Sequence, residues 1–200
     1  MIRGQHTHPI LHPSRRMVLA GAMAWAAAPV RAAAAPLNWV VLPAASTIGF
    51  AYSLNGKPAD GHFAKVTGQG QFEIADPAAA RLDIRIEAGS IDLGNPIFSA
   101  FATSAEWFDA RNHPAVVYRL RGLEPLSPGL YRARGEIEIR GKRAPTVSEI
   151  RLEIDGARAH ASGALVLDRT QFLLGVGPSS LVVDVGHEVS VSFDLVAERG

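Results

Sequence analysis

Apolar residues occupy every second position along most of the chain beyond residue 45. The runs are Ile48, Phe50, Tyr52 and Leu54; Leu82, Ile84 and Ile86; Val116, Tyr118 and Leu120; Ile137 and Ile139; Ile150, Leu152 and Ile154; and Val189, Val191, Phe193 and Leu195. Successive side chains of a β-strand point to opposite faces, so each run predicts a strand with one apolar and one polar face. Several such strands in series favour an all-β protein built as an antiparallel barrel or sandwich.

Residues that form turns separate these runs. They are Asn55-Gly56, Asp76-Pro77, Ser127-Pro128-Gly129, Gly141, Asp155-Gly156 and Gly186. The stretch from Gly61 to Ile74 alternates less regularly and carries three glycines. Glycine permits the bending that a closing barrel needs, so we expect one long, curved strand here.

One segment, residues 95–108, breaks the period of two. Apolar residues recur there at steps of three and four, at Ile97, Phe98, Phe101, Ala105 and Phe108. This spacing predicts a helix, with Pro96 in an early helical position and Asn95 as its cap. We expect this one short helix to lie across an end of the barrel.

The first 35 residues have the order of an export signal. Ser14-Arg15-Arg16 precedes the apolar run Met17–Pro29, and the Ala-rich stretch Val30–Ala35 follows it. The thirteen residues of that run are short for a spanning helix, which needs about 20. We therefore predict an export signal over residues 1–35, of twin-arginine type, and one barrel domain over 36–200 that is periplasmic or secreted.

Two other interpretations of this leader stay open. Val18 stands where twin-arginine signals often carry Phe, so export of the unfolded chain is a rival route. The segment could also be an uncleaved N-terminal helix or tail.

Charge and composition narrow the function of the remaining domain. The whole chain has a formal net charge of +1, but residues 36–200 keep only 16 basic against 19 acidic residues, a net charge of −3. The basic residues Arg132, Arg134, Arg140, Lys142 and Arg143 form no long run and indicate a solvated strand face. We therefore expect no nucleic-acid partner. The chain has no cysteine, which excludes disulfides, thiolate catalysis and cysteine-ligated metals.

Several short motifs occur in a set order between Trp39 and Arg199. They are Asp92-Leu93-Gly94-Asn95, Glu106-Trp107-Phe108-Asp109-Ala110, His113-Pro114, Gly135-Glu136-Ile137-Glu138-Ile139-Arg140-Gly141-Lys142, Leu167-Asp168-Arg169-Thr170-Gln171-Phe172, and the closing run from Val185 to Glu198. With these motifs the chain resembles the YceI-like polyisoprenoid-binding family. The resemblance implies an eight-stranded antiparallel lipocalin-like barrel whose hydrophobic tunnel takes a long isoprenoid chain. It implies a bound isoprenoid lipid or quinone, with no other cofactor.

We expect the ligand to contact the apolar lining of the barrel, because an insoluble prenyl chain gains most from burying its apolar area. Ile48 begins this inward set. The predicted ligand-binding residues are Phe50, Tyr52, Phe63, Phe72, Ile84, Ile86, Phe98, Phe101, Phe108, Val116, Tyr118, Ile137, Ile139, Phe172, Val191 and Phe193. For any single one of these residues, packing alone is the favoured interpretation, since every barrel must fill its interior.

Asp168 and Arg169 are predicted to form a polar rim at a strand end. They are expected to pair and lock the loop beside Phe172, or else to touch a polar head group. Trp107 is predicted to anchor the core near the helix end. The chain departs from the family pattern at Pro96–Phe101 and at Leu173, so the helix could deepen an apolar mouth or plug the barrel.

Two rival functions accompany the carrier hypothesis. A filled barrel could act as an envelope stress or assembly factor through surface contacts with a membrane protein. A hydrolase or isomerase could use His113 or His187, with Ser104 and Asp109 near His113, but no Gly-x-Ser-x-Gly motif is present. Histidine spacing does not favour a metal site. We predict a binding protein that makes or breaks no bond, with an inner-membrane partner and a homodimer as open interactions.

Overall fold

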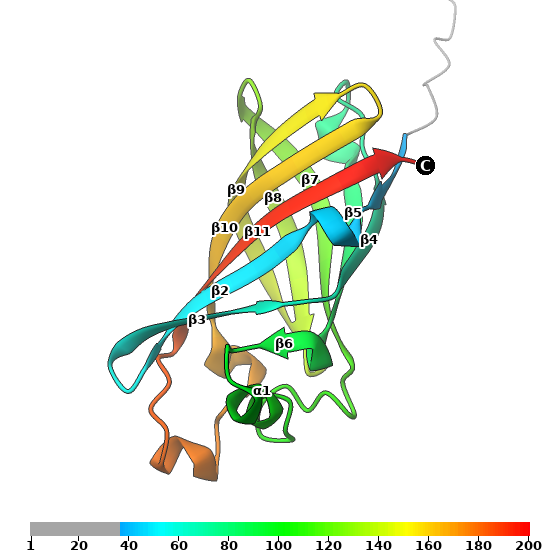
Figure 1. Cartoon of the computed structure of the whole chain (residues 1–200). Coiled ribbons are helices and arrows are strands. Elements are labelled where there is room, and N and C mark those ends of the chain that lie inside the picture. The colour runs from blue at the N-terminus through cyan, green and yellow to red at the C-terminus, as the bar shows by residue number, and fades with distance from the viewer. Residues whose placement is uncertain (1–36) are drawn as a thin grey trace, which may run out of the picture. The chain divides into compact units, whose positions relative to one another are not determined.

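The computed structural model describes residues 37–200, so the predicted export signal lies outside the described part (Figure 1). Strands dominate it. The strands are β1 Asn38–Val41, β2 Thr47–Leu54, β3 Lys57–Phe63, β4 Val66–Gln71, β5 Arg81–Glu87, β6 Ile91–Asp92, β7 Ala115–Ser127, β8 Leu130–Ile139, β9 Lys142–Asp155, β10 Arg158–Asp168 and β11 Glu188–Arg199. The helix is α1, Pro96–Ala102, and short 3₁₀ turns include η4 Arg169–Phe172 and η5 Pro178–Leu181.

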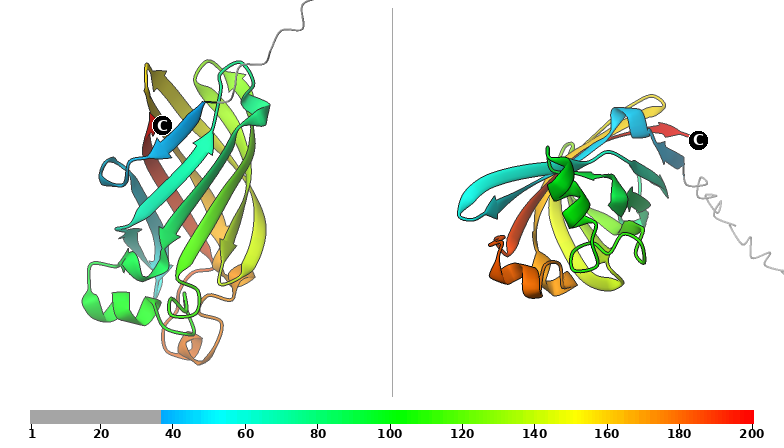
Figure 2. Two further views of the ribbon diagram at one scale, coloured as in Figure 1. Left: turned by 90° about the vertical axis from the view of Figure 1, so that its right-hand side faces the viewer. Right: turned by 60° about the horizontal axis from the view of Figure 1, so that its bottom comes forward.

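Eight strands close an antiparallel barrel, as predicted. Their order is β1-β4-β5-β7-β8-β9-β10-β11, and β1 closes the ring by pairing with the C-terminal part of β11. The N-terminal part of β11 pairs instead with β2, from which β3 and β6 continue the sheet. Figure 2 shows β2 and β3 leaving the wall as a projecting hairpin. The barrel therefore widens at the end where β11 begins.

The expected long strand over 61–74 is wrong in one respect, because it is broken into β3 and β4. The break falls at Ala64 and Lys65, whose amides donate to the carbonyl and the hydroxyl of Ser90. These contacts come from the turn before β6, some 25 residues away. The alternation of the sequence carries no sign of them.

The helix is confirmed but shorter than the predicted 95–108. Asn95 caps it, since its side chain accepts hydrogen bonds from the amides of Ile97 and Phe98. The helix ends at Ala102, and tight turns follow, with Asp109 in the left-handed region. These turns bring Trp107 and Phe108 against the barrel core.

In the half of the barrel interior away from α1, called the far half below, Leu120, Leu123, Ala133 and Ile150 form a buried apolar cluster. Tyr118 and Phe193 lie there across glycines of the neighbouring strands. A Cβ at Gly135 would lie 2.6 Å from the Tyr118 hydroxyl, and one at Gly163 would lie 2.8 Å from Cζ of Phe193. Only glycine leaves room for these rings. The aromatic rings thus fill the space that the two glycines leave.

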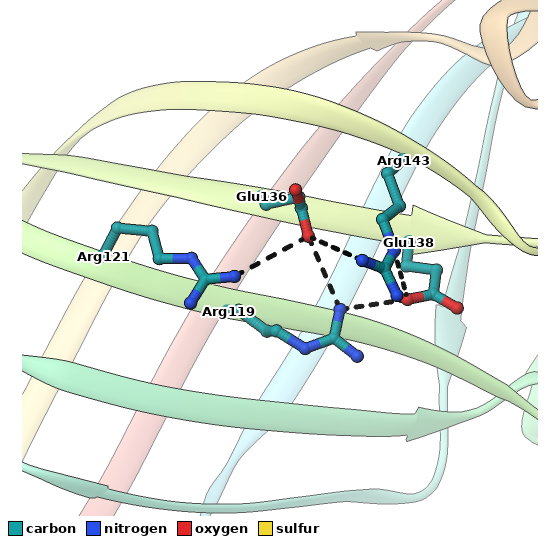
Figure 3. A network of polar contacts seen from close by, with 5 residues as sticks. All are labelled: Arg119, Arg121, Glu136, Glu138 and Arg143. Carbon is teal, nitrogen blue, oxygen red and sulfur yellow. Dashed lines mark hydrogen bonds and ion pairs between the residues drawn. The ribbon is translucent and has the colours of Figure 1, made fainter.

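Charged residues cover the outer face of the barrel wall formed by β7, β8 and β9 (Figure 3). Glu138 on β8 accepts hydrogen bonds at 3.0 Å from Arg119 of β7 and Arg143 of β9, and the bond from Arg119 lowers the pKa of Glu138. Glu136 and Arg121 extend this network. Each exposed ion pair of this kind adds little to the free energy of folding, so the main effect of the network is to keep this face of the barrel hydrated. Of the residues predicted on a solvated strand face, Arg143 is confirmed there by this network.

Candidate functional site

An apolar cavity of about 420 Å³ occupies the half of the barrel next to α1. We call this half the mouth half. The residues that line the cavity are Ile48, Phe50, Tyr52, Leu54, Asn55, Phe63, Ile86, Ile91, Leu93, Ile97, Phe98, Phe101, Ala102, Trp107, Phe108, Val116, Ile137, Ile139, Leu167, Arg169, Phe172, Leu174, Val183, Val185, Val189 and Val191. Nearly all are hydrocarbon side chains, and the volume lies within the usual 300–1,000 Å³ of small-molecule sites.

The cavity is open at the mouth end. Its lining includes the exposed side chains of Ile97, Phe98 and Phe101 on α1 and of Asn55 at the tip of the β2–β3 hairpin. Toward the far half the lining ends, because no residue of the buried cluster of Leu120, Leu123, Ala133 and Ile150 lines the cavity. It is therefore a blind pocket rather than a tunnel through the whole barrel.

Most of the residues expected to contact ligand lie on this cavity. The predicted residues that line it are Phe50, Tyr52, Phe63, Ile86, Phe98, Phe101, Phe108, Val116, Ile137, Ile139, Phe172 and Val191. Four others do not adjoin it: Ile84, Tyr118 and Phe193 are packed in the core, and Phe72 packs edge-on against Tyr131. Alternation places Ile84 and Ile86 on the same face but does not show where along a strand the packing ends.

Arg169 is the main polar contact that holds the mouth together. It is buried, and its guanidinium donates to the carbonyls of Leu174 at 2.5 Å, Val185 at 2.6 Å and Gly186 at 2.9 Å. It also lies 5.5 Å from the centre of the Trp107 ring. A charge taken from water must be matched by hydrogen bonds, and here backbone carbonyls supply them. Arg169 thereby fixes the loop between β10 and β11 over one side of the cavity.

The expected pairing of Asp168 with Arg169 is wrong. Within residues 37–200 no ion pair joins them; instead Asp168 caps η4 by accepting from the amide and hydroxyl of Thr170. These hydrogen bonds lower the pKa of Asp168. Arg169 was correctly expected to lock this loop, but it does so through carbonyls contributed by more distant residues. The local sequence could not identify those acceptors.

A second arginine, Arg140, also holds the mouth. It was expected on a solvated strand face, but it donates to the carbonyls of Ala105, Glu106 and Leu173. The Glu106 carboxylate in turn accepts from the amide of Ser179 at 2.7 Å. The turn after α1 and the loop between β10 and β11 are thus tied to each other and to the β8–β9 turn.

Few polar groups reach the cavity. Asn55 lies at its opening, where its side chain accepts from the amide of Asp184 at 3.1 Å. Burial, with a smaller effect from the Asp60 carboxylate, raises the pKa of Tyr52. Tyr52 is therefore a neutral hydroxyl at all ordinary pH values. The lining also includes Arg169 and Trp107, and the indole N–H of Trp107 has no hydrogen-bond partner within residues 37–200. An apolar chain with a small polar head would thus meet few polar atoms.

Sequence reasoning missed several cavity residues. Leu167 and Val189 continue the alternating runs of β10 and β11 and could have been included on that ground. Leu174, Val183 and Val185 come from the loop between those strands, where no periodicity exists. Trp107 was expected in the core, and it lines the cavity beside Phe101 at a ring distance of 6.1 Å.

The imagined hydrolytic set is not assembled in the described residues. The His113 ring lies 3.9 Å from the Asp109 carboxylate, but that carboxylate is held by Asn112, and Ser104 makes no hydrogen bond to His113 in the range 37–200. The same residues contain no group of three or more histidine or acidic side chains placed to hold a metal ion. None of the helices described for this chain has the length and apolar character needed to cross a membrane.

Comparisons with known proteins agree with this architecture. Among solved structures, BcnA from Burkholderia cenocepacia superposes with a TM-score of 0.71 at 26% identity, over 78% of this chain and 98% of that chain. A polyisoprenoid binding domain from Saccharophagus degradans implicated in plant cell wall breakdown gives 0.67 at 14% identity, over 82% and 99%. The Campylobacter jejuni YceI protein gives 0.61 at 16%, over 70% and 84%. No protein of curated function matches the sequence.

The match to a family model is decisive. The model for the YceI-like domain covers residues 39–197, from the first strand to the last. It spans the closed barrel, the helix and both loops that border the cavity. The chain belongs to the YceI-like family.

Proposed function

We propose that this protein binds the prenyl chain of a polyisoprenoid or an isoprenoid quinone in the mouth-half cavity. The observation that carries the proposal is an open-ended pocket of about 420 Å³ lined almost wholly by hydrocarbon. Burying apolar surface contributes roughly 25 cal/mol per Å², so an insoluble chain is favoured there without any charged partner.

The arrangement of the few polar atoms supports this ligand class. A prenyl lipid has a long apolar chain and a polar group at one end. The apolar floor of the cavity suits the chain, while Asn55 and the Tyr52 hydroxyl suit the head near the opening. The solved polyisoprenoid binding domain shares the fold, which at 14% identity supports the architecture alone.

The proposal includes where the protein works. A prenyl lipid cannot cross an aqueous compartment unaided, and a chain with an export signal over residues 1–35 would act in the envelope space. We propose that the protein sequesters or carries its ligand there without making or breaking a bond. An inner-membrane protein that exchanges ligand with it is part of the same proposal.

Lipid analysis of the native protein tests this. The protein would be purified from the envelope fraction of its own host, extracted with organic solvent and examined by mass spectrometry. We expect one isoprenoid lipid or quinone at close to one molecule per barrel. An extract without prenyl lipid, from a protein that also refuses added prenyl quinone, would contradict the proposal.

A further inference from the structure

A patch of exposed apolar side chains lies on two sides of the cavity opening. On one side, α1 exposes Ile97, Phe98 and Phe101, with Ile97 at 74% exposure. On the other side, the loop around η5 exposes Leu181 at 88% and Val182 at 82%. Figures 1 and 2 show α1 and this orange loop at the same end of the barrel. Large exposed side chains gathered at one place mark an interaction surface.

The two segments carry no charge. Residues 93–105 and 170–183 contain no Asp, Glu, Lys, Arg or His. The nearest flanking residues include the acidic Asp92 and Asp184, so the patch is not arranged to attract an anionic surface. Attraction to this surface must therefore come from apolar contact rather than from charge.

Most polar side chains in these two segments are hydrogen-bonded to their own backbone, and the hydroxyl of Ser179, which has no partner among the described residues, is buried rather than exposed on the surface. The Asn95 side chain caps α1, and the hydroxyls of Ser99, Thr103 and Ser180 donate to the carbonyls of Asn95, Ala100 and Gly177. A protein partner of ordinary kind would need polar groups free for hydrogen bonds across the interface. Hydrocarbon requires the reverse, that polar groups be satisfied internally.

From these observations we propose that the mouth end of the barrel docks on the surface of a lipid bilayer. Ile97 and Phe98 of α1 and Leu181 and Val182 beside η5 enter the interfacial region, and the cavity opening between them faces the lipid. Docking depends only on the exposed apolar patch. The purpose of docking, which is the direct passage of a prenyl chain from the bilayer into the cavity, rests on the proposed function.

Vesicle binding tests the docking step. The test uses the barrel domain, residues 36–200, because this part contains every described strand and both core clusters and forms a compact unit. Sucrose-loaded vesicles of pure phosphatidylcholine, without any prenyl lipid, would be sedimented with the domain. We expect binding that changes little between low and high salt.

Leu181→Ser/Val182→Ser is the informative variant, because neither residue lines the cavity. We expect it to weaken vesicle binding at least about tenfold, since two apolar side chains are withdrawn from the interface. The matched control is Ile74→Ser/Val147→Ser, which removes side chains that are 63% and 57% exposed elsewhere on the barrel. We expect this control to bind vesicles as the unaltered domain does.

Three results would overturn the proposal. The unaltered domain could fail to bind phosphatidylcholine, or the two double variants could behave alike. Sedimentation velocity could also show a dimer that Leu181→Ser/Val182→Ser dissociates, in which case a second copy covers the patch.

A separate titration distinguishes a failure of bilayer docking from a failure of prenyl-chain binding. A prenyl alcohol dispersed in detergent would be added to the unaltered domain and to both double variants. Prenyl binding without vesicle binding contradicts docking and leaves the proposed function intact. Vesicle binding without prenyl binding supports docking and contradicts the proposed function.

Discussion

The two halves of the barrel interior are built from the same strands but are filled differently. On β5, Ile84 packs into the far half, while Ile86, two residues further on, lines the cavity. On β11, Val191 lines the cavity and Leu195 is part of the core. In the far half, aromatic rings pack over glycines of neighbouring strands. The mouth half is covered by α1 and by the loop between β10 and β11, which are not part of the barrel wall. Inward-facing residues thus form a core or a binding site according to what closes their end of the barrel.

The largest difference is expected from truncating the two isoleucines of β5. Ile84→Ala leaves a new void in packed surroundings, and we expect it to lower the free energy of unfolding by about 3–4 kcal/mol. Ile86→Ala only enlarges an existing cavity, where its side chain has fewer partners to lose, so we expect about 1–2 kcal/mol. Urea unfolding of both variants measures this. Equal costs would show that the mouth half is as tightly packed as the far half.

The mouth half depends on polar contacts where the far half depends on packing. Arg169→Met leaves several carbonyls of the β10–β11 loop without a donor, and we expect a local loss of about 2–3 kcal/mol. Hydrogen exchange should accelerate at residues 173–186 and stay slow in β7 and β8. Arg132→Met is the matched control, because within residues 37–200 the sole ion pair of Arg132 is with the exposed Glu124, and the change should alter stability by less than about 0.5 kcal/mol. Protection that is lost equally in all strands would contradict a local role.

Replacing a side chain by a larger one should lower stability in the far half but be tolerated in the mouth half, where it should instead weaken prenyl binding. Leu195→Phe overfills the far half, and we expect a cost of about 1–3 kcal/mol with prenyl binding retained. Val191→Phe has free volume to occupy, so we expect little change in stability and at least about a tenfold loss of prenyl-quinone affinity from the filled space. Thermal unfolding and quinone titration of both variants give the comparison. Unchanged quinone affinity in Val191→Phe would place the ligand elsewhere.

The smallest effect is expected from pH. Burial raises the pKa of Tyr118 in the far half. The folded state then holds this proton more tightly than the unfolded chain, so stability is full below the ordinary tyrosine pKa of about 10 and falls as the pH rises above it. Tyr118→Phe should flatten that alkaline decline, measured by urea unfolding between neutral pH and about pH 11. A decline as steep in Tyr118→Phe as in the unaltered protein would assign it to other groups.

The barrel wall could be predicted because its signal is local. A strand with one solvent-exposed face must alternate polar and apolar residues. Residues such as Val116, Ile137 and Val191 could therefore be placed inside the barrel from the sequence alone. The cap of α1 was equally visible, since Asn95 followed by Pro96 is a local start signal.

The predictions that failed concern features that depend on contacts between segments far apart in the sequence. The break between β3 and β4 is set by Ser90, and Arg169 and Arg140 find their acceptors in loops with no periodic pattern. The depth of the cavity depends on Gly135 and Gly163, whose role becomes visible only when the rings opposite them are known. A sequence pattern ranks the faces of a strand, but it does not measure the space between them.

Fluorescence quenching tests the central claim, that a prenyl chain occupies the mouth half, most directly. The domain over residues 36–200 has two tryptophans, with Trp107 on the cavity and Trp39 in the wall outside it. Trp39→Phe and Trp107→Phe each leave one tryptophan, and each variant would be titrated with a prenyl quinone, which quenches indole at short range. We predict saturable quenching of Trp107 and little quenching of Trp39. Equal quenching of both, or quenching of Trp39 alone, would contradict a ligand held in the mouth half.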